Sequence, residues 1–362
     1  MASTIIRNVR VFNGKGLSEP TAVAFADGRL VDADRAEGVE VQGGGGTVLP
    51  GLIDAHVHVD DREQLSEYGR WGVTTVLDMG ARDWSAMRAL RDAPGVATVR
   101  SAGSPACAVR GTAVRKMGYP GSAAVAGPAD AARFVADRVA QGVDHVKIVL
   151  EEKLPFRPKP LDAATVGAVV AEAHGAGLLV AVHATSPTSF RIASDAGADV
   201  VTHAPLAGRL DDGLAREMAR RGAVVCPTLI MMKTLVEHFP FPVKPRSISY
   251  ANVVDAVRTL RRAGVALLAG TDANSDPTAP NTIPHGVSLH DELELLVQVG
   301  LTPVEALLSA TSSTADAFGL SDRGRIRAGS RADVVLVDGD PTTDITTTRN
   351  VRGVWIGGVR IH

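Results

Sequence analysis

The spacing of hydrophobic positions changes twice along the chain. From about residue 50 to residue 320, short apolar runs rich in β-branched residues alternate with longer segments whose apolar positions recur every three or four residues. This alternation is typical of βαβ units and a parallel sheet. It predicts eight strands, at residues 52–59, 74–79, 98–102, 144–150, 178–183, 200–203, 224–228 and 266–271.

Helical patterns separate these strands and also follow the last one. Between the strands we predict helices at residues 130–141, 163–175, 211–221 and 249–263, several of them followed by a glycine suited to a helix C-cap. Two more helices, 291–300 and 302–317, follow the eighth strand, and Pro303 fits the first position of the second. Eight parallel strands with intervening helices predict an α/β fold, a (β/α)8 TIM barrel over residues 51–322.

The two ends of the chain have a different pattern. Short strands with alternating polar and apolar residues, separated by turn residues, are predicted at 4–12, 22–25, 30, 39–42, 333–338 and 351–361. Both ends are therefore rich in strands and poor in helices. We expect segments 1–50 and 323–362 to form one small β-sandwich domain beside the barrel.

Composition narrows the range of partners. The net charge is −2 and the basic residues are scattered, so nothing predicts nucleic-acid binding. Two cysteines, Cys107 and Cys226, are too few for a disulfide framework, which favours a reducing compartment. No apolar stretch is long enough for a membrane helix. We expect a cytoplasmic protein that acts on a small molecule. Assembly into a homo-oligomer is possible on this composition.

A His-x-His pair at the end of the first barrel strand indicates metal binding. His56 and His58 share one face of the strand and point to the mouth of the barrel, although two histidines in an ordinary strand are the alternative. Four further candidate ligands, Lys147, His183, His203 and Asp272, end strands four, five, six and eight, where barrel enzymes carry their active-site residues. This set suits Zn²⁺, with Mn²⁺, Co²⁺ and Fe²⁺ as alternatives.

Several segments resemble the amidohydrolase superfamily over nearly the whole chain. They are VLPGLIDAHVH, HVKIV, VAVHA, VVTHAP, LLAGTDAN and the C-terminal stretch from TPVEALLSATSSTADAFGL to GSRADVVLVDGDP. The chain is most similar to the imidazolonepropionase-like and prolidase-like branch.

This resemblance implies two Zn²⁺ ions per chain and a carboxylated Lys147 that bridges them. His56, His58 and Asp272 would hold the more buried ion, and His183 and His203 the more exposed one. The alternative is an unmodified lysine beside a single metal ion. A carbamate is chemically reasonable, because a neutral lysine amine can add CO₂ and two cations stabilise the resulting negative charge.

The activity implied is hydrolysis of an amide, peptide-like or cyclic C–N bond of a small molecule by a metal-activated hydroxide. Asp272 would be the proton shuttle, and His203 is a second catalytic candidate besides its role as a ligand. Hydrolysis of a lactone, ester or phosphoester on the same site is an alternative, and so is a non-catalytic binding protein.

Candidate substrate contacts lie in the loops that follow the strands. The long segment after the third strand contains Arg110, Arg115 and Tyr119, which could bind a carboxylate or a carbonyl group. Met231 after the seventh strand could form an apolar wall. His285 follows the eighth strand and is a further candidate contact.

Overall fold

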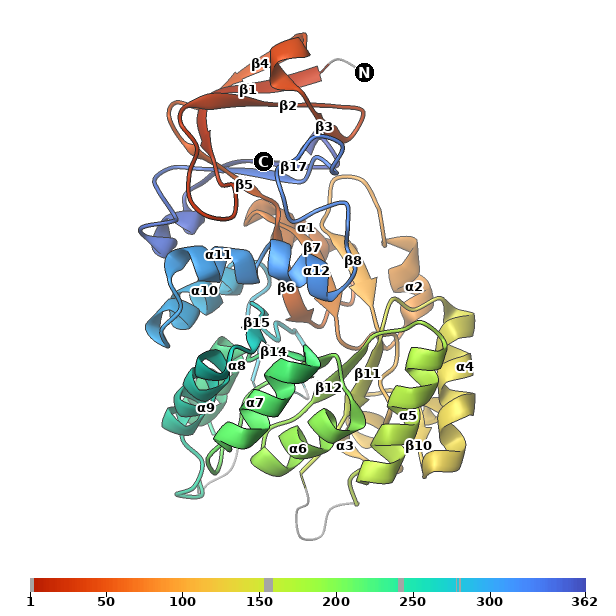
Figure 1. Ribbon diagram of the computed structural model, residues 1–362. Helices are drawn as coiled ribbons and strands as arrows, with labels where there is room; N and C mark the ends of the chain where they lie inside the picture. The colour runs from red at the N-terminus through yellow and green to blue at the C-terminus, as the bar shows by residue number, and fades with distance from the viewer. Residues whose placement is uncertain (1–2, 153–158, 240–243, 278, 280) are drawn as a thin grey trace.

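Eight parallel strands form the centre of the larger part of the protein (Figure 1). The computed structural model describes residues 3–152, 159–239, 244–277, 279 and 281–362. Each predicted strand of this region is confirmed, with shorter bounds in most cases. The strands are β6 (Leu52–Val57), β7 (Val73–Asp78), β8 (Thr98–Ser101), β11 (Val146–Val149), β12 (Val180–His183), β13 (Val200–Thr202), β14 (Val224–Cys226) and β15 (Ala266–Leu267).

Hydrogen bonds connect these strands in a barrel-like order. Strands β6–β8 form one parallel sheet and β11–β15 another. The isolated parallel bridges Ala106↔Ile148 and Val57↔Ala273 join the two sheets, one at each edge. All eight strands therefore point the same way, and the residues at their carboxyl ends meet on one side of the fold.

Helices follow the strands, and their ends show why they begin and stop where they do. The carboxylates of Asp162 and Asp211 accept hydrogen bonds from the third backbone amide of the helices that follow them, and Gly142 and Gly222 end helices in the left-handed conformation. The helices before the last two are α1 (Arg62–Arg70), α2 (Trp84–Ala89), α3 (Thr112–Arg115), α4 (Ala131–Gln141), α5 (Ala163–Gly175), α6 (Pro187–Ala196), α7 (Asp212–Arg221), α8 (Leu229–Glu237), α9 (Tyr250–Ala263) and α10 (Ser288–Gln298). In the described part of the chain, none of the helices has the length and apolarity needed to cross a membrane.

The single helix predicted for residues 302–317 is wrong. Two helices, α11 (Pro303–Ser309) and α12 (Ser312–Ala317), take its place, and Pro303 occupies the first turn of α11 as expected. Hydroxyl groups compete with the helical backbone at the break, where Thr311 Oγ1 donates to the Leu307 carbonyl. The break leaves the Ala310 carbonyl free to accept from the Ile53 amide at 2.7 Å. The interrupted helix thus binds the base of strand β6.

The two ends of the chain share one connected sheet, so they meet beside each other. The first strands, drawn in red and orange, lie beside the last ones, drawn in blue (Figure 1). Strand β5, which the sequence analysis missed because it is buried on both faces and shows no alternation, pairs antiparallel with β16. The strands are β1 (Ser3–Val11), β2 (Thr21–Ala26), β3 (Arg29–Val31), β4 (Gly38–Gln42), β5 (Thr47–Pro50), β16 (Val334–Val337), β17 (Val351–Ile356) and β18 (Val359–Arg360).

Candidate metal centre and active site

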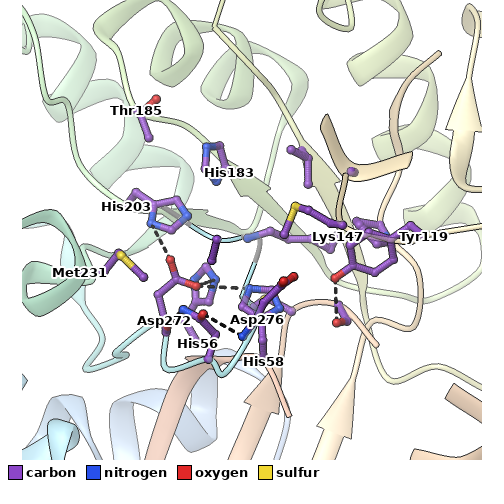
Figure 2. Close-up of a pocket in the computed structure, with 18 of the residues that line it drawn as sticks. His56, His58, Tyr119, Lys147, His183, Thr185, His203, Met231, Asp272 and Asp276 are labelled. Carbon is purple, nitrogen blue, oxygen red and sulfur yellow. Dashed lines mark hydrogen bonds and ion pairs between the residues drawn. The ribbon is translucent and has the colours of Figure 1, made fainter. Parts of the chain in front are cut away.

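A cavity of about 340 Å³ opens at the carboxyl ends of the eight parallel strands. The structure brings all six predicted metal ligands into its lining. They are His56, His58, Lys147, His183, His203 and Asp272. Figure 2 shows these side chains converging from different strands on one region of the cavity. Residues that are up to 216 positions apart in the sequence, 56 and 272, are neighbours here because parallel strands end on the same side.

His56, His58 and Asp272 form the tightest part of the cluster. Oδ1 of Asp272 lies 3.3 Å from His56 Nε2 and 3.2 Å from His58 Nε2. Ligand atoms that surround one zinc ion tetrahedrally at about 2.0–2.2 Å are roughly 3.3–3.6 Å apart, so these spacings are close to those around a shared divalent cation. One potential ligand atom from each residue lies within 4.8 Å of the others. This group is therefore a possible metal site.

The remaining ligand candidates border this group. The ring of His203 lies 4.9 Å from that of His56 and 4.3 Å from that of His183, measured between centroids. His203 Nδ1 is hydrogen-bonded to Thr228 Oγ1 at 2.8 Å, which leaves its other ring nitrogen for a different partner. Lys147 Nζ donates to Thr202 Oγ1 at 2.7 Å.

Three residues at the strand ends have a left-handed backbone that L-residues seldom adopt. His203, Thr228 and Asp272 have φ angles of 73°, 47° and 58°, and they follow strands β13, β14 and β15. Such a conformation costs about 1–3 kcal/mol at a non-glycine position and persists only where surrounding contacts enforce it. Here it turns the side chains of His203 and Asp272 into the cavity. Nothing in the residue pattern predicts these angles.

Burial keeps most of the imidazoles neutral. Desolvation, followed by the positive charge of Lys147, lowers the pKa of His183 to about 3. Burial also moves the pKa of His56 and of His203 well below the usual value. For His58 burial acts in the same direction, but the Asp272 carboxylate outweighs it and raises the pKa. Neutral imidazole is the form that binds metal ions.

Burial has a comparable effect on the lysine. It lowers the pKa of Lys147 to about 7, although Asp272 opposes the shift. Around neutral pH a large part of this side chain is therefore the uncharged amine. An amine in that form is a nucleophile, which a surface lysine at the same pH is not.

Two buried carboxylates support the ligands, and the sequence analysis assigned them no role. Asp54 accepts from the His56 backbone amide at 3.2 Å and from Thr271 Oγ1 at 2.7 Å, which ties the first strand to the loop after the last. Asp78 ends strand β7 and accepts from the Val59 amide at 3.3 Å and from the Ser101 hydroxyl. The candidate ligands were selected because they end predicted strands, and the same criterion would have selected Asp78.

The predicted substrate contacts divide into two groups. Tyr119 and Met231 line the cavity. Arg110 and Arg115 are exposed and do not belong to the lining, because Ala113 occupies the inward face of α3 and leaves Arg115 on its outer face. His285 is also outside the lining and is hydrogen-bonded to Tyr68 and Ser275, at 3.1 Å each.

The arginine that does line the cavity is one that the sequence analysis did not single out. Arg82, in the loop after β7, is ion-paired through one terminal nitrogen with Asp276 at 3.0 Å and through the other with Asp60 at 2.8 Å. Both carboxylates also line the cavity. Three separate loops are thus joined through one guanidinium group.

Comparison with known proteins identifies the family. The amidohydrolase family matches residues 47–361, which is most of the chain. The chain belongs to the amidohydrolase family. It is accordingly an enzyme, a hydrolase acting on C–N bonds, and the alternative of a non-catalytic binding protein is set aside. The predicted superfamily resemblance is confirmed.

Two relatives illustrate what the chain is similar to. This amidohydrolase is 28% identical over 329 residues to an uncharacterized protein of Mycobacterium tuberculosis, covering 82% of this chain and 81% of that one. It is 32% identical over 200 residues to the imidazolonepropionase of Deinococcus deserti, covering 53% of this chain and 44% of the relative.

The fold is shared with enzymes of known structure. A Xaa-Pro dipeptidase with bound methionine matches with a TM-score of 0.82 at 24% identity, covering 99% of both chains. Molinate hydrolase matches with a TM-score of 0.80 at 21% identity, covering 99% of this amidohydrolase and 94% of that chain. At these identities the likeness concerns the fold.

Proposed function

We propose that this amidohydrolase cleaves an amide, peptide-like or cyclic C–N bond of a small molecule and depends on divalent metal ions. The observation that carries the proposal is the convergence of two imidazole nitrogens, from His56 and His58, on one carboxylate oxygen of Asp272 inside a cavity. A cavity of about 340 Å³ is of the size that takes a small molecule. The dipeptidase and molinate hydrolase that share the fold differ in their named substrates, so we propose a bond class.

The donor set suits two Zn²⁺ ions. His56, His58 and Asp272 would hold one ion, and His183 and His203, whose rings are 4.3 Å apart, a second one. When bound, such ions acidify a water molecule and polarise the substrate carbonyl. Because burial keeps the imidazoles of His56, His183 and His203 neutral, they need no deprotonation before they bind metal.

We further propose that Lys147 is carboxylated and joins the two halves of the site. In the described part of the chain its ammonium group has Thr202 as a hydrogen-bond partner and no carboxylate within 4.0 Å. A buried lysine without a counter-ion favours the neutral amine. Attack of this amine on CO₂ forms an N–C bond and releases one proton, and the resulting carbamate offers two oxygen ligands.

Asp272 is the group that we assign to proton transfer. Its side chain is 15% exposed, lines the cavity and lies 4.0 Å from His203 through its second oxygen. From this position the carboxylate can accept the proton of an attacking water and return it to the leaving nitrogen. His203, placed between His56 and His183, is the second residue that we assign to the reaction, as a ligand whose ring borders the substrate space.

We infer that the eight parallel strands close a (β/α)8 barrel over residues 51–322. The two bridges between the sheets support this arrangement. We also infer that segments 1–50 and 323–362 form a small β-sandwich. Strand β1 pairs with both halves of the terminal sheet, and the rings of Phe25 and Trp355 pack edge to face at 5.9 Å between them.

Metal analysis combined with histidine variants tests the proposal. The purified enzyme is expected to contain between one and two equivalents of zinc or a similar ion per chain, and chelation is expected to abolish amide hydrolysis. His56→Ala should lose most of the metal and at least about a hundred-fold in activity, because a catalytic metal ion accounts for several kcal/mol of transition-state stabilisation.

His174→Ala is the matched control. His174 is 42% exposed on its side chain and is paired with Asp199 at 2.9 Å, outside the cavity lining. Its removal should change neither metal content nor turnover. Full activity in metal-free enzyme, or equal metal content in the His56→Ala and His174→Ala proteins, would contradict the metal-dependent mechanism.

A further inference from the structure

The polar groups on the substrate side of the cavity are already bonded to the protein. The Tyr119 hydroxyl donates to the Gly80 carbonyl at 2.8 Å, and the side-chain amide of Asn274 donates to the Asp272 carbonyl at 2.9 Å. Thr185 Oγ1 donates to Glu152 at 3.3 Å. These groups offer little free hydrogen-bonding capacity to a charged ligand.

Much of the remaining lining is apolar. Three of the apolar side chains lie on one helix, α8, at positions 231, 232 and 235, and the others come from loops and strand ends around the cavity. Flexible thioethers adapt to apolar ligands of irregular shape. The apolar side chains concerned are Met117, Val149, Leu206, Met231, Met232 and Leu235.

The guanidinium group of Arg82 is neutralised by two carboxylates. Its two terminal nitrogens donate to Asp276 and Asp60 at 3.0 and 2.8 Å. Asp276 is almost fully buried, with 8% of its side chain exposed, whereas the Arg82 and Asp60 side chains are 36% and 43% exposed. An arginine that recognises a carboxylate presents these nitrogens as a free fork. Here the fork is divided, and the three residues together carry a net charge of −1.

A substrate carboxylate placed beside Arg82 would meet two like charges. It would have to share the guanidinium with Asp60 and Asp276 or displace one of them, and a displaced carboxylate would lose its ion pair with Arg82 in a partly desolvated cavity. Like-charge contacts of this kind are a common means by which a binding site rejects the wrong ligand. A neutral ligand meets no such penalty.

We propose that Asp60, Arg82 and Asp276 form a selectivity bridge that excludes substrates with a free carboxylate, so that the enzyme acts on neutral, largely apolar amides or ureas. The choice of bond rests on the function proposed above, whereas the selectivity rests on the bridge and the apolar lining. Asp60 and Asp276 are thus specificity-determining residues, and Arg82 holds their loops together across the cavity.

Acetanilides that differ only in the para substituent test the bridge. The neutral para-carboxamide and the para-carboxylate have similar shape, and both release an aniline whose appearance is measured. We expect kcat/KM for the carboxamide to exceed that for the carboxylate by at least about ten-fold. Asp276→Asn and Asp60→Asn should each reduce this ratio several-fold, because each removes one of the two negative charges beside Arg82.

Asp137→Asn is the control variant. Asp137 is paired with Arg133 at 3.3 Å on helix α4 and does not line the cavity. The Asp137→Asn substitution should leave the ratio of the two kcat/KM values unchanged. Equal or faster turnover of the carboxylate by the unaltered enzyme, or the same ratio in both bridge variants as in Asp137→Asn, would overturn the proposal.

Binding measurements test the selectivity bridge independently of the proposed hydrolysis. Calorimetry with the same two anilides on the Asp272→Asn enzyme, after its metal content has been measured, reports affinity without turnover. A ten-fold preference for the carboxamide with no hydrolysis by the unaltered enzyme would support the bridge and reject anilide hydrolysis. Tighter binding of the carboxylate would reject the bridge whether or not either compound is hydrolysed.

Discussion

His203 and Thr228 are joined by a hydrogen bond of 2.8 Å between Nδ1 and Oγ1. Both residues follow strands of the parallel sheet, both have positive φ angles, and both are buried. The threonine therefore determines the rotation of the imidazole ring and which of its nitrogens can bind another partner. The hydroxyl group of a residue that follows β14 thus orients a candidate ligand that follows the neighbouring strand β13.

Replacement of Thr228 by the isosteric valine should impair the site without unfolding the protein. We expect Thr228→Val to lower metal affinity or kcat by about 10- to 100-fold, the usual effect of removing a group that orients a metal-binding histidine. Metal titration and steady-state kinetics measure the two quantities.

The protein contains a matched control for this change. Thr348 Oγ1 is hydrogen-bonded to His290 Nδ1 at 2.9 Å, and both residues are buried outside the cavity lining. Thr348→Val should cost about 1–2 kcal/mol of unfolding free energy and leave metal affinity unchanged. Equal losses of metal affinity in the two variants would refute the orienting role of Thr228.

Asp272→Asn should lower kcat by about two to four orders of magnitude, because the amide cannot accept the proton of the attacking water. The side chain keeps its shape, so thermal unfolding should change little. Kinetics at equal metal occupancy measure the effect. Near-normal turnover would show that another group moves the proton.

Carboxylation of Lys147 predicts a dependence on CO₂. Enzyme stripped of metal and reloaded in CO₂-free buffer should recover only a small part of its activity, and added bicarbonate should restore the rest. Native mass spectrometry of the reloaded enzyme should show one additional CO₂ per chain. Lys147→Gln, which cannot form a carbamate, should give neither the added mass nor the response to bicarbonate. Full recovery without CO₂ would indicate an unmodified lysine.

Glu292 predicts a specific pH dependence of stability. This fully buried carboxylate accepts from the Leu229 and Ile230 amides at the start of helix α8, at 2.9 and 2.8 Å, and burial raises its pKa from 4.5 to about 8. Between these two pH values the folded state keeps a proton that the unfolded state has lost. Its contribution to stability is therefore present below pH 4.5 and is lost as the pH rises to about 8, by up to about 1.4 kcal/mol per pH unit.

Glu292→Gln removes this titration, so its unfolding free energy should fall less steeply between pH 5 and 8 than that of the unaltered protein. Urea unfolding at a series of pH values measures both curves. Glu305→Gln is the control, because the Thr302 backbone amide lowers the pKa of Glu305 and its titration therefore lies below this range. Parallel curves for the unaltered and Glu292→Gln proteins would contradict the raised pKa.

The sequence predicted well those features that depend on local pattern or on strand position. All eight parallel strands and the meeting of the two chain ends could be predicted, because the periodicity of apolar residues follows from which side chains are buried. All six candidate ligands, His203 among them, could be placed at one site because side chains at the carboxyl ends of parallel strands converge whatever the details of packing. The break at Ala310 escaped prediction, since its advantage is a hydrogen bond to Ile53 in a distant strand.

The details that decide chemistry and selectivity required the tertiary structure. Arg110, Arg115 and Arg82 are equivalent in the sequence as loop arginines, but only the fold of the loops shows that Arg82 lines the cavity and is paired with Asp60 and Asp276. Residue type alone fixes which groups can bind a metal ion or a proton. Which of them face the same cavity, and which already have a hydrogen-bond or ion-pair partner, depends on contacts between distant segments, such as Arg82 and Asp276, which are 194 residues apart.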